Sequence, residues 1–278
     1  MKHLFDTYSY DASRRVTKKY STSFYAGIKC LDRRIRKDVH AIYGLVRFAD
    51  EIVDSFHDFD KEILLEEFRL ATFEAIDRKI SLNPILNSFQ YTVNKYSIDH
   101  ALIEQFFASM AMDLRPVDYT NESYQLYILG SAEVVGLMCL KIFVYGDDAE
   151  FQRLKPAAMK LGSAFQKINF LRDLRSDYNE LGRTYFPDLD TRNMLPEDKQ
   201  LIEREIEADF KEAYAGIIQL PKSSRFGVYL SYVYYTKLLR RIQRKSATDL
   251  LSKRIRVSNN AKALLFAKSY ILNRINLL

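Results

Sequence analysis

Residues 164–177 read AFQKINFLRDLRSD, and four oxygen-bearing side chains recur there at steps of three, four and four residues. They are Gln166, Asn169, Asp173 and Asp177. At about 3.6 residues per turn, this spacing places them on one continuous stripe of a helix whose other faces are apolar. A helix that is apolar on several sides is typically buried, and a buried acidic stripe needs compensating charge. The stretch therefore predicts a functional acidic stripe on an interior helix.

A second acidic stripe is predicted at residues 47–54, which read RFADEIVD. Asp50 and Asp54 are four residues apart and share a helix face, and Arg47 precedes Asp50 by one turn. Taken alone, such a pair is typical of a solvated helix face, and its like charges repel slightly. Together with residues 164–177, it predicts two acidic helices that face each other across a helical bundle.

The side chains of the two stripes are suited to Mg²⁺, with Mn²⁺ as an alternative. Carboxylate and amide oxygens are the ligands that Mg²⁺ prefers, and it completes its shell with waters and substrate phosphate oxygens. The 4 histidines are scattered, so a zinc or di-iron site is not expected. No Gly-rich phosphate loop is present, which disfavours nucleotide chemistry. The remaining chemistry is a metal-bridged diphosphate, whose departure the metals assist by neutralising its charge.

The chain as a whole predicts an all-α fold. Its 278 residues include 9 glycines and 6 prolines, few for a many-turned β protein, and its hydrophobic periodicity is helical almost throughout. We predict a single all-α domain over residues 1–278 with roughly ten helices, since no linker or repeat interrupts the pattern. The predicted helices cover 32–54, 60–79, a segment opened by Pro84, 99–114, 122–144, a segment from Pro156 to about 178, and about 197–218, 222–245 and 258–275.

Composition also bears on the compartment. Two cysteines exclude a disulfide scaffold and a cysteine-rich zinc site, and the count suits a cytoplasmic protein. The first residues have no apolar core typical of a signal peptide. The most apolar stretch, 132–146, is interrupted by Glu133 and Lys141, so we expect no transmembrane helix.

Positive charge is concentrated in the last part of the chain. The net charge is +6, and residues 237–278 contain 11 Lys and Arg against one acid, Asp249. A solvated helix face explains this distribution, and so does binding to an anionic lipid surface or a phosphorylated ligand. No zinc finger or RNP-type signature accompanies it, so we expect no nucleic-acid partner.

The order and flanks of these motifs resemble the squalene and phytoene synthase family of head-to-head prenyl transferases. The matching segments are STSFY at 21–25, YGLVRFADEIVD at 43–54, MDL at 112–114, VGLM at 135–138, AFQKINFLRD at 164–173, GRTYFP at 182–187 and RIRVS at 254–258. The resemblance implies an isoprenoid-synthase fold with a central cavity. Two prenyl diphosphates would condense there through a cyclopropylcarbinyl diphosphate.

The resemblance also implies roles for individual residues. The Mg²⁺ ligands would be Asp50, Asp54, Asn169, Asp173 and Asp177. Diphosphate would be contacted or oriented by Ser21, Arg47, Gln166 and Arg172. The pocket near the reacting carbons would be lined by Phe24, Tyr43 and Tyr235, with Tyr232 and Tyr234 competing for the place of Tyr235. Asp113 would support the metals.

Two departures from the family pattern are visible. Lys167 stands where the family usually has an uncharged residue, and the segment between Asp177 and Gly182 is one residue longer than its commonest phytoene synthase form.

The basic residues expected on a membrane-facing surface are Lys245, Lys253, Arg254, Lys262 and Lys268. Arg256 is set apart from them, because the resemblance points it at the diphosphate.

Among family members we expect a phytoene synthase, which condenses two geranylgeranyl diphosphates and loses a proton without using NADPH. The FADEIVD form of the first motif is closer to bacterial carotenoid enzymes than to squalene synthases. Three alternatives stay open: a dehydrosqualene or squalene-type synthase acting on farnesyl diphosphate, a hopanoid-pathway relative, and an inactive member serving as a scaffold. A basic helical protein that only binds membranes would explain the tail but not the two acidic stripes.

Overall fold

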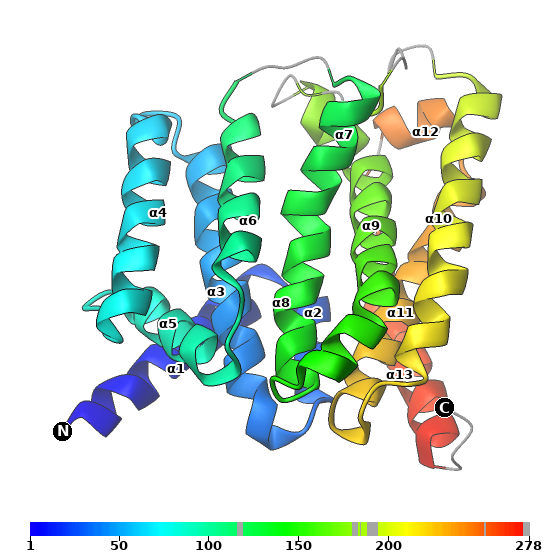
Figure 1. The fold of residues 1–278 in the computed structure, drawn as a ribbon. Coiled ribbons are helices and arrows are strands. Elements are labelled where there is room, and N and C mark those ends of the chain that lie inside the picture. Colours follow the sequence, from blue (N-terminus) through cyan, green and yellow to red (C-terminus); the bar gives the residue numbers. More distant parts are fainter. Residues whose placement is uncertain (116–118, 180–182, 184, 188–193, 253, 275–278) are drawn as a thin grey trace.

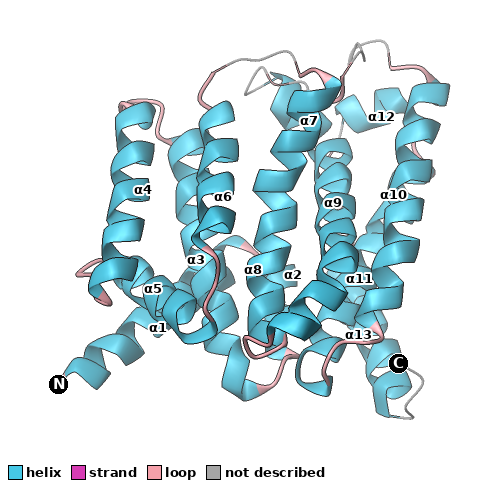
Figure 2. Cartoon of the chain, viewed as in Figure 1, coloured by secondary structure: helices cyan, strands magenta, loops and turns pink. Residues whose placement is uncertain are grey.

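The computed structural model describes residues 1–278 except 116–118, 180–182, 184, 188–193, 253 and 275–278. Every regular element in these described ranges is helical, which confirms the all-α prediction (Figures 1 and 2). The helices are α1 Lys2–Tyr20, α2 Thr22–Lys29, α3 Arg33–Ser55, α4 Lys61–Arg78, α5 Pro84–Tyr96, α6 His100–Met112, α7 Asn121–Ile128, η1 Leu129–Glu133, α8 Val134–Phe143, α9 Asp148–Asn179, α10 Pro196–Ile217, α11 Lys222–Gln243, α12 Ala247–Ser252 and α13 Asn259–Arg274.

Four of the predicted helix starts are fixed by side-chain caps. The carboxylates of Asp32, Asp60 and Asp99 accept backbone N–H groups in the first turns of α3, α4 and α6. Asn83 caps α5 in the same way, and Pro84 occupies its first turn. Each cap satisfies an N–H group that has no partner within the helix, so these starts could be read from the sequence.

The predicted start of the long acidic helix at Pro156 is wrong. Helix α9 begins at Asp148 and contains Pro156 in its interior. The Asp147 carboxylate accepts the N–H of Glu150 (3.0 Å), and Phe151 is buried in an apolar cluster beside it. Because an internal proline removes only one helical hydrogen bond, the cap and the packing extend the helix past it.

The predicted helix 122–144 consists of three consecutive helical segments, α7, η1 and α8. The middle one, η1, is a single π-helical turn, an element that is frequent at functional sites. By length and composition, Asn121–Phe143 could cross a membrane, with a mean hydropathy of 1.7 in its most apolar window. Half of that window is buried inside the protein, as is usual for a core helix.

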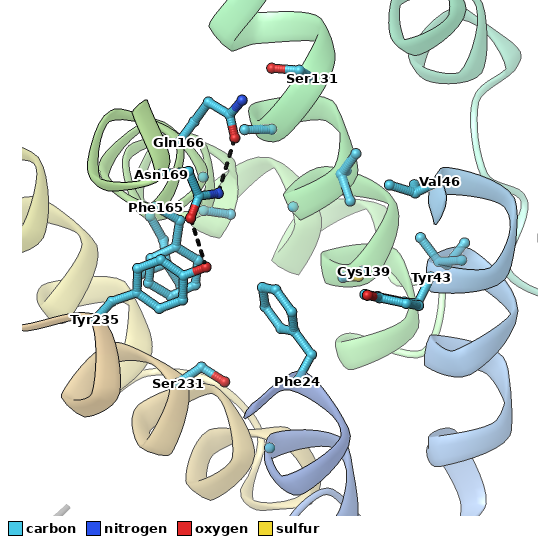
Figure 3. Close-up of a pocket in the computed structure, with 18 of the residues that line it drawn as sticks. Phe24, Tyr43, Val46, Ser131, Cys139, Phe165, Gln166, Asn169, Ser231 and Tyr235 are labelled. Carbon is cyan, nitrogen blue, oxygen red and sulfur yellow. Dashed lines mark hydrogen bonds between the residues drawn. The ribbon is translucent and has the colours of Figure 1, made fainter. Parts of the chain in front are cut away.

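Helix α9 lies in the middle of the bundle, between α8 and α10 (Figure 1). The close approach of α9 to η1 depends on Gly162, where an added Cβ would lie 2.8 Å from the Ala132 carbonyl oxygen. Helix α3 lies across from α9, with α8 between them (Figure 3). The acidic ends of α3 and α9 therefore open on the same space.

Candidate active site

One cavity of about 620 Å³ connects the helices that carry the two stripes. Its charged lining consists of five aspartates and four arginines. They are Asp50, Asp54, Asp113, Asp173, Asp177, Arg47, Arg172, Arg183 and Arg254. The rest of the wall is largely apolar and aromatic (Figure 3). The predicted convergence of the two stripes on one cavity is confirmed.

The aspartates belong to the C-terminal ends of three helices. Asp54 and Asp177 lie in the last turns of α3 and α9, and Asp113 is the C-cap of α6. Helix C-termini carry partial negative charge, so the aspartates add to an already negative potential. The aspartates and the helix ends thus add negative charge to this end of the cavity, opposite the positive charge of the four arginines.

On the α3 wall, arginines are paired with all three acidic side chains. Arg47 forms ion pairs with Asp50 and Glu51, and its guanidinium stacks over the Tyr20 ring at 4.4 Å. The Nη1 atom of Arg183 donates to Asp54 at 2.8 Å. The Nε atom of Arg47 is buried and has no hydrogen-bond partner among the described residues, so its guanidinium retains donor capacity.

The α9 wall carries the second stripe. Asp173 is paired with Arg172 and with Arg254, whose Nε lies 2.7 Å from the carboxylate. Asn169 accepts the Tyr235 hydroxyl at 3.2 Å and donates to Gln166 at 3.3 Å (Figure 3). These contacts fix the orientation of the amide and leave the stripe facing the cavity.

Asp113 connects the two walls. Its carboxylate accepts the hydroxyls of Tyr127 at 2.6 Å and Tyr185 at 3.2 Å, and its backbone carbonyl accepts from Arg183 at 2.8 Å. Arg183 also binds Asp54, so Asp113 holds the arginine that reaches the first stripe. Sequence reasoning expected a supporting role for Asp113 but gave none to Tyr127. Arg183 and Tyr185 stood in the GRTYFP segment without an assigned function.

Three aspartates of the cavity have raised pKa values. Burial and the neighbouring Asp54 raise the pKa of Asp50 to about 7, although Arg47 opposes the shift. Burial and the charges of Asp173 and Asp54 raise the pKa of Asp177 to about 8. Burial raises that of Asp113 to about 6. Burial and neighbouring like charges thus oppose the ionisation of all three carboxyl groups.

The raised pKa values predict that the metal-free protein loses stability as pH rises from 6.5 to 8. In that window the folded chain holds protons on Asp50 and Asp177 that the unfolded chain has already released, so deprotonation favours unfolding. His40, whose pKa burial lowers to about 4, opposes this trend only at the start of the window, because the unfolded histidine loses its remaining proton there. Melting temperatures measured across the window should fall, and less steeply in Asp177→Asn. A wild-type melting temperature that rises with pH across this window would contradict the raised pKa values of Asp50 and Asp177.

Of the predicted site residues, all of which the structure describes, Ser21 and Arg256 lie outside the cavity wall. The Ser21 hydroxyl oxygen caps α2 by accepting the N–H of Phe24 at 3.2 Å. Tyr235 lines the cavity and Tyr232 and Tyr234 do not, which decides among the three tyrosines.

The prediction for the basic segment after α12 is wrong for Arg254. Arg254 was placed on a membrane-facing surface, yet it lines the cavity and binds Asp173. Arg256, expected at the diphosphate, is exposed, and its carbonyl oxygen accepts from Arg241. The segment has no helical periodicity, so the sequence could not show which of the two arginines faces inward. Lys253, another predicted member of that surface, lies outside the described residues.

Lys167 lies on the face of α9 that turns away from the cavity. It is buried against α10 and donates to Asp209 at 2.9 Å, and Lys160 and Ser163 bind the same carboxylate. Burial opposes ionisation of Asp209, but the three donors hold its pKa below the ordinary value. The charge of Lys167 is thus matched within the α9–α10 interface, and the acidic stripe is unaffected.

The cavity residues fit Mg²⁺ as a partner of a bound diphosphate. Among the residues that the structure describes, no three carboxylate, imidazole or thiol groups form a ready metal cluster. Mg²⁺ characteristically uses one or two carboxylates and completes its shell with water and substrate phosphate. Two carboxylates on each wall, with an amide oxygen on α9, are the donor set for that arrangement.

Comparison with known proteins agrees with this geometry. The family model for squalene/phytoene synthase matches residues 17–261. The chloroplastic phytoene synthase 1 of Zea mays is 26% identical over 94% of this chain and 68% of its own length, and that of Solanum lycopersicum is 28% identical with the same coverage. The chloroplastic phytoene synthase of Cucumis melo is 29% identical, over 94% of this chain and 66% of its own.

Solved structures share the fold. A dehydrosqualene synthase superposes with a TM-score of 0.82 at 20% identity, covering 97% of this chain and 98% of its own. A squalene synthase from Alicyclobacillus acidocaldarius gives 0.73 at 21% identity, covering 85% and 93%. With the family model covering most of its length and both acidic motifs converging on one cavity, the chain belongs to the squalene/phytoene synthase family.

Proposed function

We propose that the protein is a phytoene synthase, which condenses two geranylgeranyl diphosphates head to head through prephytoene diphosphate and releases diphosphate. The observation that supports this most strongly is a single cavity with two facing acidic stripes at one end and a long apolar interior. The charged end suits diphosphate, and the apolar interior suits isoprenoid chains. Proton loss completes the reaction, so no NADPH is required.

At the charged end, the arginines would bind and orient the diphosphate groups. Arg47 and Arg172 belong to the two motif helices, and Arg183 and Arg254 reach in from the segments that follow α9 and α12. Each of them is paired with an aspartate of the cavity. Mg²⁺, when bound to those aspartates, would neutralise the departing diphosphate and so favour cleavage of the carbon–oxygen bond. The guanidiniums would then be available to the diphosphate oxygens.

Aromatic rings border the space next to the charged end. Phe165 stacks on Tyr235 with 3.9 Å between ring centroids, and Phe24 lies 6.0 Å from Tyr43 and 6.2 Å from Tyr235 (Figure 3). Ring faces stabilise a nearby cation, so these residues would stabilise the allylic carbocation and exclude water from it. Burial raises the pKa of Tyr43 to about 12, so its phenol stays protonated.

Product analysis tests the proposal directly. We expect the purified protein with Mg²⁺ to convert the C20 diphosphate into a C40 hydrocarbon, with no change in product on adding NADPH. Conversion of the C15 diphosphate alone would instead favour dehydrosqualene synthase, to which the fold is similar. A product that becomes reduced with NADPH would favour a squalene-type enzyme. No hydrocarbon under any condition would favour an inactive member of the family.

We further propose a cytoplasmic protein that binds reversibly to the anionic inner face of the membrane. Leu264, Lys268 and Ile271 are exposed and recur at steps of four and three on α13, which gives it an apolar and basic face. Lys245 is exposed just beyond the end of α11, whereas the pKa of Lys262 is lowered by burial and by Arg256. Long hydrocarbon substrates and products partition into membranes, so an enzyme that handles them benefits from lying at the bilayer.

Vesicle flotation checks this surface. We expect binding to anionic vesicles at low salt, since each Lys or Arg near such a surface contributes about 1 kcal/mol. Release is expected at 1 M salt, where screening acts within about 3 Å. Lys268→Glu should weaken binding, and Glu74→Gln, at an exposed position on α4, should not. Binding that does not depend on lipid charge would contradict the proposal and indicate that the exposed face of α13 is an ordinary solvated surface.

A further inference from the structure

Residues of α9 line the cavity along its whole length, from the acidic end to the deep end. Below the acidic stripe, six residues of α9 line the cavity: Leu154, Ala157, Ala158, Leu161, Gly162 and Phe165. Ala157, Ala158 and Gly162 are the small ones among them, and Ala158 packs against the apolar cluster at the deep end of the cavity. At about 1.5 Å per residue, Ala158 lies about 22 Å along the helix from Asp173.

The neighbouring helix α8 also has a small residue at this depth. Gly136 of α8 lines the cavity, and a Cβ added to it would lie 3.3 Å from the carbonyl oxygen of Ala158. The two helices therefore present a hydrogen and a methyl group side by side, and Gly162 and Ala132 form a similar small pair one turn nearer the acidic stripe. The cavity consequently extends to this depth along both helices.

One turn deeper, larger side chains close the cavity. Leu140, Leu154 and Leu220 are buried in one apolar cluster, and Phe143 packs against it. All four also line the cavity, so this cluster is its floor. Ala158 packs against the same cluster and so lies directly above the floor.

We propose that Ala158, with Gly136 beside it, determines the length of isoprenoid chain that the cavity accepts. The proposal rests on the proposed function. One helical turn is about 5.4 Å, which is close to the length of an isoprene unit. The space above Leu154 would therefore take the last unit by which a C20 chain exceeds a C15 chain. A larger side chain at position 158 would occupy it.

The test compares Ala158→Leu with the wild type in a competition between C15 and C20 diphosphates. We expect the ratio of kcat/KM for C20 over C15 to fall about 10- to 100-fold. Hydrophobic pockets typically discriminate by such a factor between substrates that differ by a small apolar group. Gln152→Leu adds an apolar side chain at an exposed position of α9 and should leave the ratio unchanged. Leu154→Ala should deepen the cavity and raise the relative use of a C25 diphosphate.

Binding of unreactive S-thiolo analogues gives a second readout that does not depend on turnover. Ala158→Leu should weaken binding of the C20 analogue far more than that of the C15 analogue, and Ala158→Val serves if the leucine variant does not fold. If a folded variant keeps the wild-type preference for C20 over C15, both in kcat/KM and in analogue binding, the proposal is overturned. A wild type that accepts only C15 would overturn it together with the proposed substrate. A wild type that binds both analogues but forms no hydrocarbon would overturn the proposed function alone.

Discussion

Asp50→Asn is expected to reduce hydrocarbon formation by about 10³-fold or more while leaving the melting temperature unchanged or raised. An amide supplies no negative charge to a metal, and the metal's stabilisation of a departing diphosphate amounts to several kcal/mol. The fold should not suffer, because Asp50 lies beside the Asp54 carboxylate and its pKa is raised to about 7. Removing one of two repelling charges relieves that repulsion.

Product formation and thermal unfolding, both measured at pH 8, check this expectation. Asp58→Asn is the matched control, since Asp58 is exposed beyond the end of α3 and does not line the cavity. It should retain the activity of the wild type. A strongly destabilised Asp50→Asn protein would show that the carboxylate is a structural ion-pair partner of Arg47.

Arg183→Met is expected to lower the stability of the metal-free protein by about 3 kcal/mol, as is typical when one partner of a buried ion pair is removed. The arginine side chain is 9% exposed and bridges Asp54 and Asp113, so its loss leaves two carboxylates without a cation. For a domain of this size the melting temperature should fall by roughly 6–12 °C. Turnover should fall too, because Arg183 is one of the four cavity arginines.

Thermal unfolding with and without Mg²⁺ and inorganic diphosphate separates the two roles of Arg183. Ligand that binds the folded state restores stability, so part of the loss should be recovered when the metals neutralise the same carboxylates. Arg115→Met, which removes an exposed ion pair with Glu62, should cause no measurable change. Equal melting temperatures for Arg183→Met and the wild type would contradict the bridging role.

The two acidic stripes could be predicted because helical spacing converts sequence separation into a shared face. Other features escaped the same reasoning for physical reasons. Helix α1 has a buried face built from small polar residues, including Ser13, whose hydroxyl lies 2.7 Å from that of Ser88, and Thr17, 2.9 Å from His40. Such a helix shows no apolar periodicity, so it was not expected.

Contacts between distant segments were equally hidden. Tyr127 and Tyr185 bind Asp113 from two separate parts of the chain, and no spacing rule connects them. Arg254 reaches Asp173 from an irregular segment, where the facing of a side chain is set by tertiary packing. The two motifs therefore specified the carboxylates of both stripes together with Arg47 and Arg172, whereas the partners that come from distant segments had to be found in the structure.

Calorimetric titration of Mg²⁺ and inorganic diphosphate tests most directly whether the two stripes act as one site. The variants are Asp54→Asn on α3, Asp177→Asn on α9 and the double substitution. If both walls hold the same metal–diphosphate complex, each single variant should lose at least about tenfold in affinity, and the double variant should lose little more. A variant of one stripe that binds as tightly as the wild type, while the other abolishes binding, would contradict a shared site.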